Sequence, residues 1–271
     1  MSEGEAGMGR VGERDRAGQG DLRGREASGR LGRYGLWMVG LGFVVLVLLG
    51  TMLDADLRLS RCFYNPEAPQ RWFLQTTVPW IWLNRYGEYP VWLLVAGTAA
   101  VWCGSLRRRA WVRYRRACAV CVLAAALGPG LVINGMLKPV WGRPRPHQVE
   151  LFGGTRSYRP WWQPGHLGGG KSFSSGHAAA GYVLVAGAYL VVQRRRGLAT
   201  GGALLYGSLV GFARIVDGAH FVSDVLWSGS LMCFTVATLH AVLPALSPPE
   251  SPPEFASTAG SLYNRATLEP S

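Results

Sequence analysis

Two histidines and one aspartate in the second half of the chain could support covalent catalysis. His220 and Asp224 are four residues apart, so on a helix both lie on one face and the carboxylate can hold one ring N–H of the imidazole. The other ring nitrogen is then free to attack, as in a catalytic triad. His177 supplies a second imidazole, so that one ring can attack phosphorus while the other protonates the leaving oxygen. This set indicates phosphoryl transfer through a covalent histidine intermediate.

Basic side chains and one expected helix start could bind the phosphate. The residues predicted to do so are Lys138, Arg145, Ser175, Gly176 and Arg214. The three cations can neutralise the three equatorial oxygens of the transferring group. The serine hydroxyl and the glycine N–H stand where a helix begins, and the helix dipole favours an anion there. No metal-ligand spacing occurs among the cysteines and histidines, so no metal site is predicted.

These residues form three segments: Lys138-x6-Arg145-Pro146, Ser175-Gly176-His177 and Arg214-x5-His220-x3-Asp224. In this order they resemble the three-part signature of the type-2 phosphatidic acid phosphatase superfamily, which includes vanadium haloperoxidases and glucose-6-phosphatase. The resemblance implies a six-helix membrane core and metal-independent phosphatase chemistry without a cofactor. It further implies that His220 is the nucleophile, Asp224 its orienting partner and His177 the acid.

The resemblance extends over residues 54–243 and has two departures. Ser174 and Ala213 stand where the family usually has proline and serine, which removes a rigid backbone element and a hydroxyl but no charged group. The segments Phe63-Tyr64, Gly142-Arg-Pro-Arg-Pro and Phe152-Gly153-Gly154 resemble bacterial lipid A phosphatases, the 4′-type more than the 1-type.

Long uncharged runs must position these segments. They cover residues 34–53, 89–106, 117–137, 178–193, 197–213 and 225–246. A hydrocarbon core about 30 Å thick needs roughly 17 to 25 helical residues. The sequence therefore predicts an all-α polytopic membrane bundle with six transmembrane helices, the last beginning near Phe221 so that Asp224 falls in its first turn.

Arginine placement predicts the orientation. Arginines cluster before residue 34, between residues 107 and 116, and at 194–196, and positive residues favour the cytoplasmic side. The three motif segments then face outward, which predicts a multi-pass protein of the bacterial inner membrane with a periplasmic active site. The outward loop 138–177 is itself basic and includes Arg143, which an anionic substrate would explain. The rival interpretation is an inverted topology.

Composition excludes several classes. Of the 271 residues 49% are hydrophobic and only 16% are charged, well below the share in soluble globular chains. The formal charge is +12, with 28 basic against 16 acidic residues, and an arginine excess suits phosphate partners. Nucleic acid is not an expected partner, and the oligomeric state is not predicted. Residues 1–33 and 247–271 are expected to be disordered cytoplasmic segments around a domain at 34–246.

The function predicted from these features is removal of a phosphate from a lipid at the outer leaflet. A phospholipid, lipid A or a polyprenyl pyrophosphate could present its phosphate there without leaving the bilayer. One alternative is a phosphotransferase that passes the same phosphohistidine to a lipid acceptor. Others are a lipid transporter or scramblase, and an inactive structural homologue.

Overall fold

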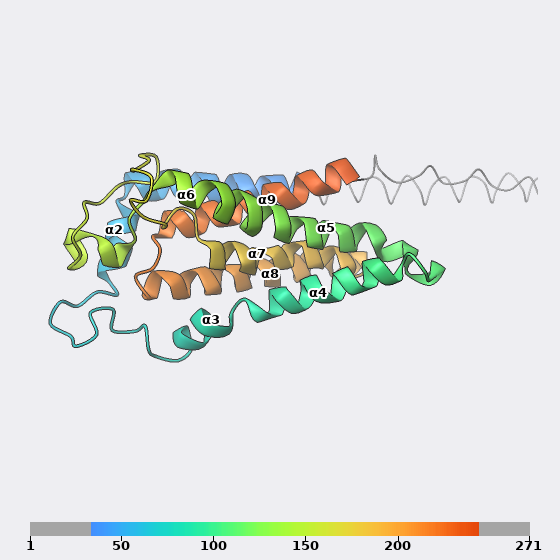
Figure 1. Ribbon diagram of the computed structural model, residues 1–271, viewed down its shortest axis with the longest axis horizontal. Coiled ribbons are helices and arrows are strands. Elements are labelled where there is room, and N and C mark those ends of the chain that lie inside the picture. Colours follow the sequence, from blue (N-terminus) through green and yellow to red (C-terminus); the bar gives the residue numbers. More distant parts are fainter. Residues whose placement is uncertain (1–33, 244–271) are drawn as a thin grey trace, which may run out of the picture.

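In the computed structural model, which describes residues 34–243, the chain folds into an elongated bundle of helices (Figure 1). The predicted all-α class is confirmed for these residues, in which two isolated bridges are the only β-type contacts. The segments predicted to be disordered, and the end of the predicted domain at residues 244–246, lie outside the described part of the chain.

Six helical segments run along the bundle. They are the N-terminal helix Tyr34–Met52, α4 (Tyr89–Gly104), the continuous run of α5 (Arg115–Ala125), η2 (Ala126–Leu137) and α6 (Lys138–Trp141), α7 (Gly176–Gly187) with η5 (Ala188–Leu190), α8 (Gln193–Val216), and α9 (Val222–Val242). Shorter elements connect them: α2 (Ala55–Arg61), α3 (Trp80–Tyr86), η1 (Arg109–Tyr114), η3 (Pro146–Gln148) and η4 (Glu150–Phe152).

Four of the described helices are long and apolar enough to cross a membrane: Tyr34–Met52, Arg109–Gln148, Gln193–Val216 and Val222–Val242. The predicted spans at 89–106 and 178–193 form shorter helices instead, 16 residues in α4 and 12 in α7 before the chain tightens into η5. Sixteen residues of α-helix measure about 24 Å, less than the hydrocarbon core. The chain is a multi-pass membrane protein, but the number of spans stays a prediction.

The third segment is not a regular α-helix. Pro129 lies inside η2, whose turns are π-helical. A proline within a helix lacks an N–H and clashes with the preceding turn, and a wider turn accommodates this. The segment nevertheless continues to Lys138, so the irregular stretch carries the first motif to the end of the bundle.

Helix α7 lies at the centre of the bundle and packs against α4, α5, η2, α8 and α9. Small residues permit this close packing: a Cβ added at Gly181 would lie 2.9 Å from the Cα of Gly207, and one at Gly207 would lie 2.3 Å from the Tyr182 ring. Helices in membranes commonly approach through such small residues. The N-terminal helix instead exposes Leu41, Leu46 and Leu49, as a lipid-facing helix would.

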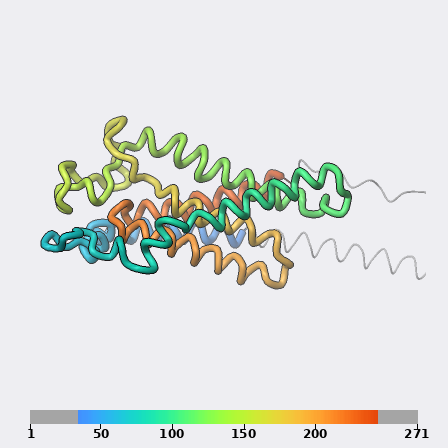
Figure 2. Tube along the Cα trace, turned by 60° about the horizontal axis from the view of Figure 1, so that its bottom comes forward, coloured from blue at the N-terminus to red at the C-terminus, as the bar shows by residue number. Residues whose placement is uncertain are grey.

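One end of the bundle, here called the loop end, carries residues 53–88 and 142–175. The α4–α5 and α7–α8 connections lie at the opposite end (Figures 1 and 2). A second, smaller core fixes the loops: Trp72, Val149, Phe152 and Phe221 are buried together. The loop end is therefore a packed cap over the helix termini.

Candidate active site

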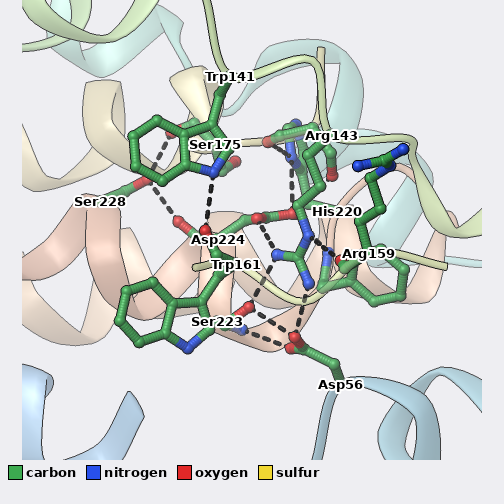
Figure 3. Close-up of polar contacts among 12 residues, drawn as sticks. Asp56, Trp141, Arg143, Arg159, Trp161, Ser175, His220, Ser223, Asp224 and Ser228 are labelled. Atoms are coloured by element: carbon green, nitrogen blue, oxygen red, sulfur yellow. Dashed lines mark hydrogen bonds and ion pairs between the residues drawn. The ribbon is translucent and has the colours of Figure 1, made fainter. Parts of the chain in front are cut away.

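All three predicted segments converge at the loop end. Lys138 begins α6, Ser175 caps α7, Arg214 lies in the last turn of α8, and Asp224 lies in the first turn of α9. Ser228 links two of these segments, since its hydroxyl bridges the carbonyls of Ser175 and Asp224 (Figure 3). The structure thus brings together residues that are up to 86 positions apart in the sequence, from 138 to 224.

His220 is buried, with 1% of its surface exposed, and its Nδ1 lies 2.8 Å from the carbonyl oxygen of Ser172. A carbonyl accepts only, so Nδ1 carries the proton and Nε2 keeps its lone pair. The prediction that Asp224 holds this N–H directly is wrong in geometry, because its Oδ2 lies 3.7 Å from Nδ1. His220 precedes the cap residue Phe221 and is not on the helix, so the assumed helical face does not exist.

Asp224 acts on the histidine through Ser172. Its Oδ2 accepts the Ser172 hydroxyl at 2.6 Å and the Phe221 N–H at 2.9 Å. The residue that supplies its carbonyl to His220 is therefore itself fixed by the carboxylate. The predicted start of the last helix near Phe221, with Asp224 in its first turn, is confirmed.

Arg143 occupies the space behind Asp224 and is fully buried. It forms ion pairs with Asp224 and with Asp56 of α2, the latter at 2.7 Å, and it donates to Ser223 Oγ at 2.9 Å (Figure 3). Its guanidinium lies 4.4 Å from the centre of the Phe221 ring. The expectation that this arginine serves an anionic substrate is therefore wrong, because two carboxylates of the protein neutralise it.

Tyr158 completes this buried group. Burial raises the pKa of Tyr158 above its ordinary value, and the nearby Asp56 carboxylate raises it further. The phenol therefore stays protonated and donates to Asp56 Oδ2 at 3.3 Å. With one arginine between two aspartates, the group carries a formal charge of −1 next to His220.

Two of the three predicted phosphate-binding cations donate to side-chain amides. Lys138 Nζ donates to Asn134 Oδ1 at 2.7 Å, and Arg214 Nη1 donates to Asn84 Oδ1 at 3.1 Å. Arg214 Nη1 also lies 3.3 Å from Asp217 Oδ2. Burial raises the pKa of Asp217 above its ordinary value, and the nearby arginine offsets part of that rise. Lys138 and Arg214 both act electrostatically on His220.

The absence of a side chain at Gly176, at the start of α7, leaves room for the Lys138 ammonium group. A Cβ at Gly176 would lie 2.8 Å from Lys138 Nζ, so a larger residue there would displace the ammonium group. The Ser175 hydroxyl oxygen accepts the Ala178 N–H at 3.3 Å and so caps the helix. That bond leaves its hydrogen free to be donated, as the prediction of phosphate binding requires.

His177 is the most open of the site's histidines, with 37% of its side chain exposed, and its Nδ1 lies 3.5 Å from Glu88 Oε1. Arg214, Lys138 and Arg145 all act electrostatically on it. The Arg145 backbone N–H is bound by Gln148 Oε1 at 3.1 Å, which fixes the start of η3. The predicted acid His177 and the predicted nucleophile His220 thus both lie within the influence of Lys138 and Arg214.

Sequence reasoning gave Arg143 the wrong partner and missed several other residues that shape this site: Asp56, Asn84, Glu88, Ser172 and Ser223. The alternating Arg-Pro pattern around Arg143 gave a signal of special geometry, and the i, i+4 spacing of Asn84 and Glu88 beside an apolar run was another. Nothing in the sequence near Asp56 indicates its partner. Within residues 34–243, no group of three or more His, Cys, Asp or Glu side chains could share a metal ion.

A family model and several curated proteins match part of this chain. The PAP2 superfamily model matches residues 117–247. Lipid A 4′-phosphatase of Francisella tularensis subsp. novicida is 33% identical over 134 residues, which are 49% of this chain and 60% of that protein. Lipid A 4′-phosphatase of Rhizobium leguminosarum is 36% identical over 115 residues, 40% of this chain and 48% of that protein. The chain thus spans about half the length of the curated relatives it matches.

A solved structure shares the fold. It is the crystal structure of a transmembrane PAP2 type phosphatidylglycerolphosphate phosphatase from Bacillus subtilis, with a TM-score of 0.50 and 21% sequence identity, covering 80% of this chain and 100% of that one. The matched residues 117–247 contain all three motif segments and the helices that carry them. Over these residues the chain is similar to the PAP2 superfamily.

Proposed function

We propose that this protein is a membrane lipid phosphatase that hydrolyses a phosphate monoester of a lipid through a phosphohistidine on His220. One observation carries the proposal: the buried His220 ring is held at Nδ1 by Ser172, so Nε2 keeps its lone pair, and Lys138 and Arg214 act on it. A nucleophile beside fixed cations suits attack on a bound phosphoryl group.

The reaction has two steps. His220 Nε2 attacks phosphorus and the P–O bond to the lipid breaks, while protonated His177 gives its proton to the leaving oxygen. Lys138, Arg145 and Arg214 neutralise the equatorial oxygens, with donors from Ser175 and the N–H of Gly176. Water then attacks phosphorus, its proton passes to His177, and the P–N bond breaks to release phosphate and regenerate both rings.

The substrate proposed first is lipid A with a phosphate at the 4′ position. The relatives from Francisella and Rhizobium carry the name lipid A 4′-phosphatase, which supports this choice over phosphatidic acid or a polyprenyl pyrophosphate. A site at a helix terminus, where headgroups meet water, suits a lipid that keeps its acyl chains in the bilayer.

The active site is proposed to face the extracytoplasmic side of a bacterial inner membrane. The arginines between α4 and α5 and those that begin α8 lie at the end of the bundle opposite to the site (Figure 1). Positive residues are retained in the cytoplasm, so the site would open toward the outer leaflet.

A phosphate-release assay tests the proposal. Purified protein would be incubated with lipid A, phosphatidylglycerol phosphate, phosphatidic acid and undecaprenyl pyrophosphate. We expect release from lipid A, at least 10³-fold reduced in His220→Ala, roughly the loss expected when the residue that forms a covalent intermediate is removed. His166→Ala is the matched control, since His166 is an exposed histidine of the same loop end.

Two outcomes would reject the proposal. Normal turnover by folded His220→Ala would exclude the phosphohistidine. Phosphate transfer to a lipid acceptor without free phosphate would indicate the phosphotransferase instead, and lipid flipping without any phosphate release would indicate the transporter.

A further inference from the structure

The corner between α3 and α4 contributes two polar side chains to the site from outside the three motif segments. Asn84 lies in α3, and Glu88 is the cap residue of α4, four positions later. Asn84 contacts Arg214, and Glu88 contacts His177. One short stretch of chain therefore contacts both a predicted phosphate-binding residue and the predicted acid.

Several contacts fix this corner against α8. Asn84 Nδ2 donates to the Ala213 carbonyl at 3.3 Å, and Tyr206 Oη donates to the Gly87 carbonyl at 3.1 Å. A Cβ at Gly87 would lie 3.1 Å from Val210 Cγ2, so the Gly87 backbone packs closely against the Val210 side chain of α8. The position of Glu88 is thus set by helix packing rather than by a free loop.

Glu88 differs in charge from the other groups around His177. The charged groups that act most strongly on His177 are Arg214 of α8, Glu88, Lys138 of α6 and Arg145 of η3. On the α9 side, Asp224 is paired with Arg143 and Ser172, and His220 is bound to the Ser172 carbonyl. Glu88 is the carboxylate among these groups that lies 3.5 Å from Nδ1 of the His177 ring.

We infer that Glu88 is a positioning residue for His177. Its carboxylate pairs with Nδ1 at ion-pair distance, which turns Nε2 toward the leaving oxygen, and its charge offsets three neighbouring cations so that the imidazolium form is retained until proton transfer. Glu88 itself keeps its protonation state throughout, since the proton moves only between His177 Nε2 and the leaving oxygen or water. The inference rests on the proposed function, in which His177 is the acid.

The test compares pH profiles of kcat for Glu88→Gln and the unsubstituted protein, with lipid A and with nitrophenyl phosphate. Loss of the carboxylate makes the imidazolium harder to retain, so the alkaline limb should move to lower pH by roughly one unit for this half-exposed pair. Nitrophenyl phosphate needs little protonation of its leaving group, so its turnover should fall much less than that of lipid A. Glu88→Asp, which keeps the charge, should return the limb toward its original position.

The control is Glu67→Gln, since Glu67 is an exposed glutamate of the same end and its side chain has no part in the site. An alkaline limb of Glu88→Gln that superimposes on the original would overturn the inference. An equal loss at every pH and with both substrates would also overturn it, because that pattern indicates a merely structural role. Activity of His220→Ala decides the proposed function separately.

Discussion

At the scale of single residues, the Nδ1 partner of the His220 ring is the backbone carbonyl of Ser172, and the Asp224 carboxylate binds the hydroxyl of that same serine. Ser172 O is 2.8 Å from His220 Nδ1, whereas Asp224 Oδ2 is 3.7 Å away. Spacing alone suggested a direct contact because it assumed a helix through both residues. The residue types were predictable from the motif, but the atoms in contact depend on where α9 begins.

Substitutions can separate the contribution of the Asp224 carboxylate to kcat from that of the Ser172 hydroxyl. Asp224→Asn should lower kcat by about 10²- to 10⁴-fold, because it removes the negative charge behind the imidazole that becomes positive on phosphorylation. Ser172→Ala should cost about tenfold or less, because the carbonyl remains and only one hydroxyl bond is lost. Steady-state kinetics on lipid A would measure both. Equal losses would show that the hydroxyl, not the charge, is what matters.

Ser174, which stands where the family usually has proline, is buried and its hydroxyl oxygen has no hydrogen-bond partner among the described residues. Ser174→Ala should therefore leave stability unchanged or raise it by about 1 kcal/mol, since an unsatisfied group is removed. Ser228→Ala is the matched control and should destabilise, because that buried hydroxyl bridges two carbonyls. Thermal midpoints in detergent would test the pair, and a clear destabilisation by Ser174→Ala would contradict it.

At the scale of elements, Arg143 joins three parts of the chain that the sequence does not relate. It binds Asp56 of α2, Asp224 of α9 and the Arg159 carbonyl in the 142–175 loop. The apolar runs predicted the helices, and the motif order predicted which ends meet. Neither could indicate that α2 contributes a carboxylate, because pairing across 87 residues leaves no local pattern.

Arg143→Ala should destabilise the protein by about 3–5 kcal/mol, because two buried carboxylates lose their common partner. It should also disturb His220, whose support depends on Asp224. The control is Arg159→Ala, which removes an arginine side chain that bonds Pro164 O at an exposed position and leaves the Arg159 carbonyl in place. Unfolding in detergent would report the difference. Similar midpoints for the two variants would argue against the buried ion-pair network.

At the scale of the whole molecule, the bundle has the candidate site at one end, and two clusters of arginines, between α4 and α5 and at the start of α8, at the other (Figure 1). Two of the six predicted spans are helices of 16 and 12 residues, shorter than the predicted runs. Hydropathy does not indicate where a helix ends within an apolar run. Helix α7, for example, ends at Gly187 and the tighter helix η5 follows it, although the residues there are still apolar. The direction of each segment was nevertheless predictable, because an even number of crossings returns every motif to the same end.

Orientation can be tested with cysteines at the two ends. Cys62 caps α2 at the loop end and is exposed, and Arg195 is exposed at the start of α8 on the opposite end. In spheroplasts, a membrane-impermeant maleimide should label Cys62 of the unsubstituted protein. It should reach Arg195→Cys, in a background carrying Cys62→Ser and Cys103→Ser, only after detergent is added. The double Cys→Ser background alone is the control for labelling of the remaining buried thiols. Labelling in the reverse order would mean that the basic clusters lie outside and the site faces the cytoplasm, where a lipid of the outer leaflet could not reach it.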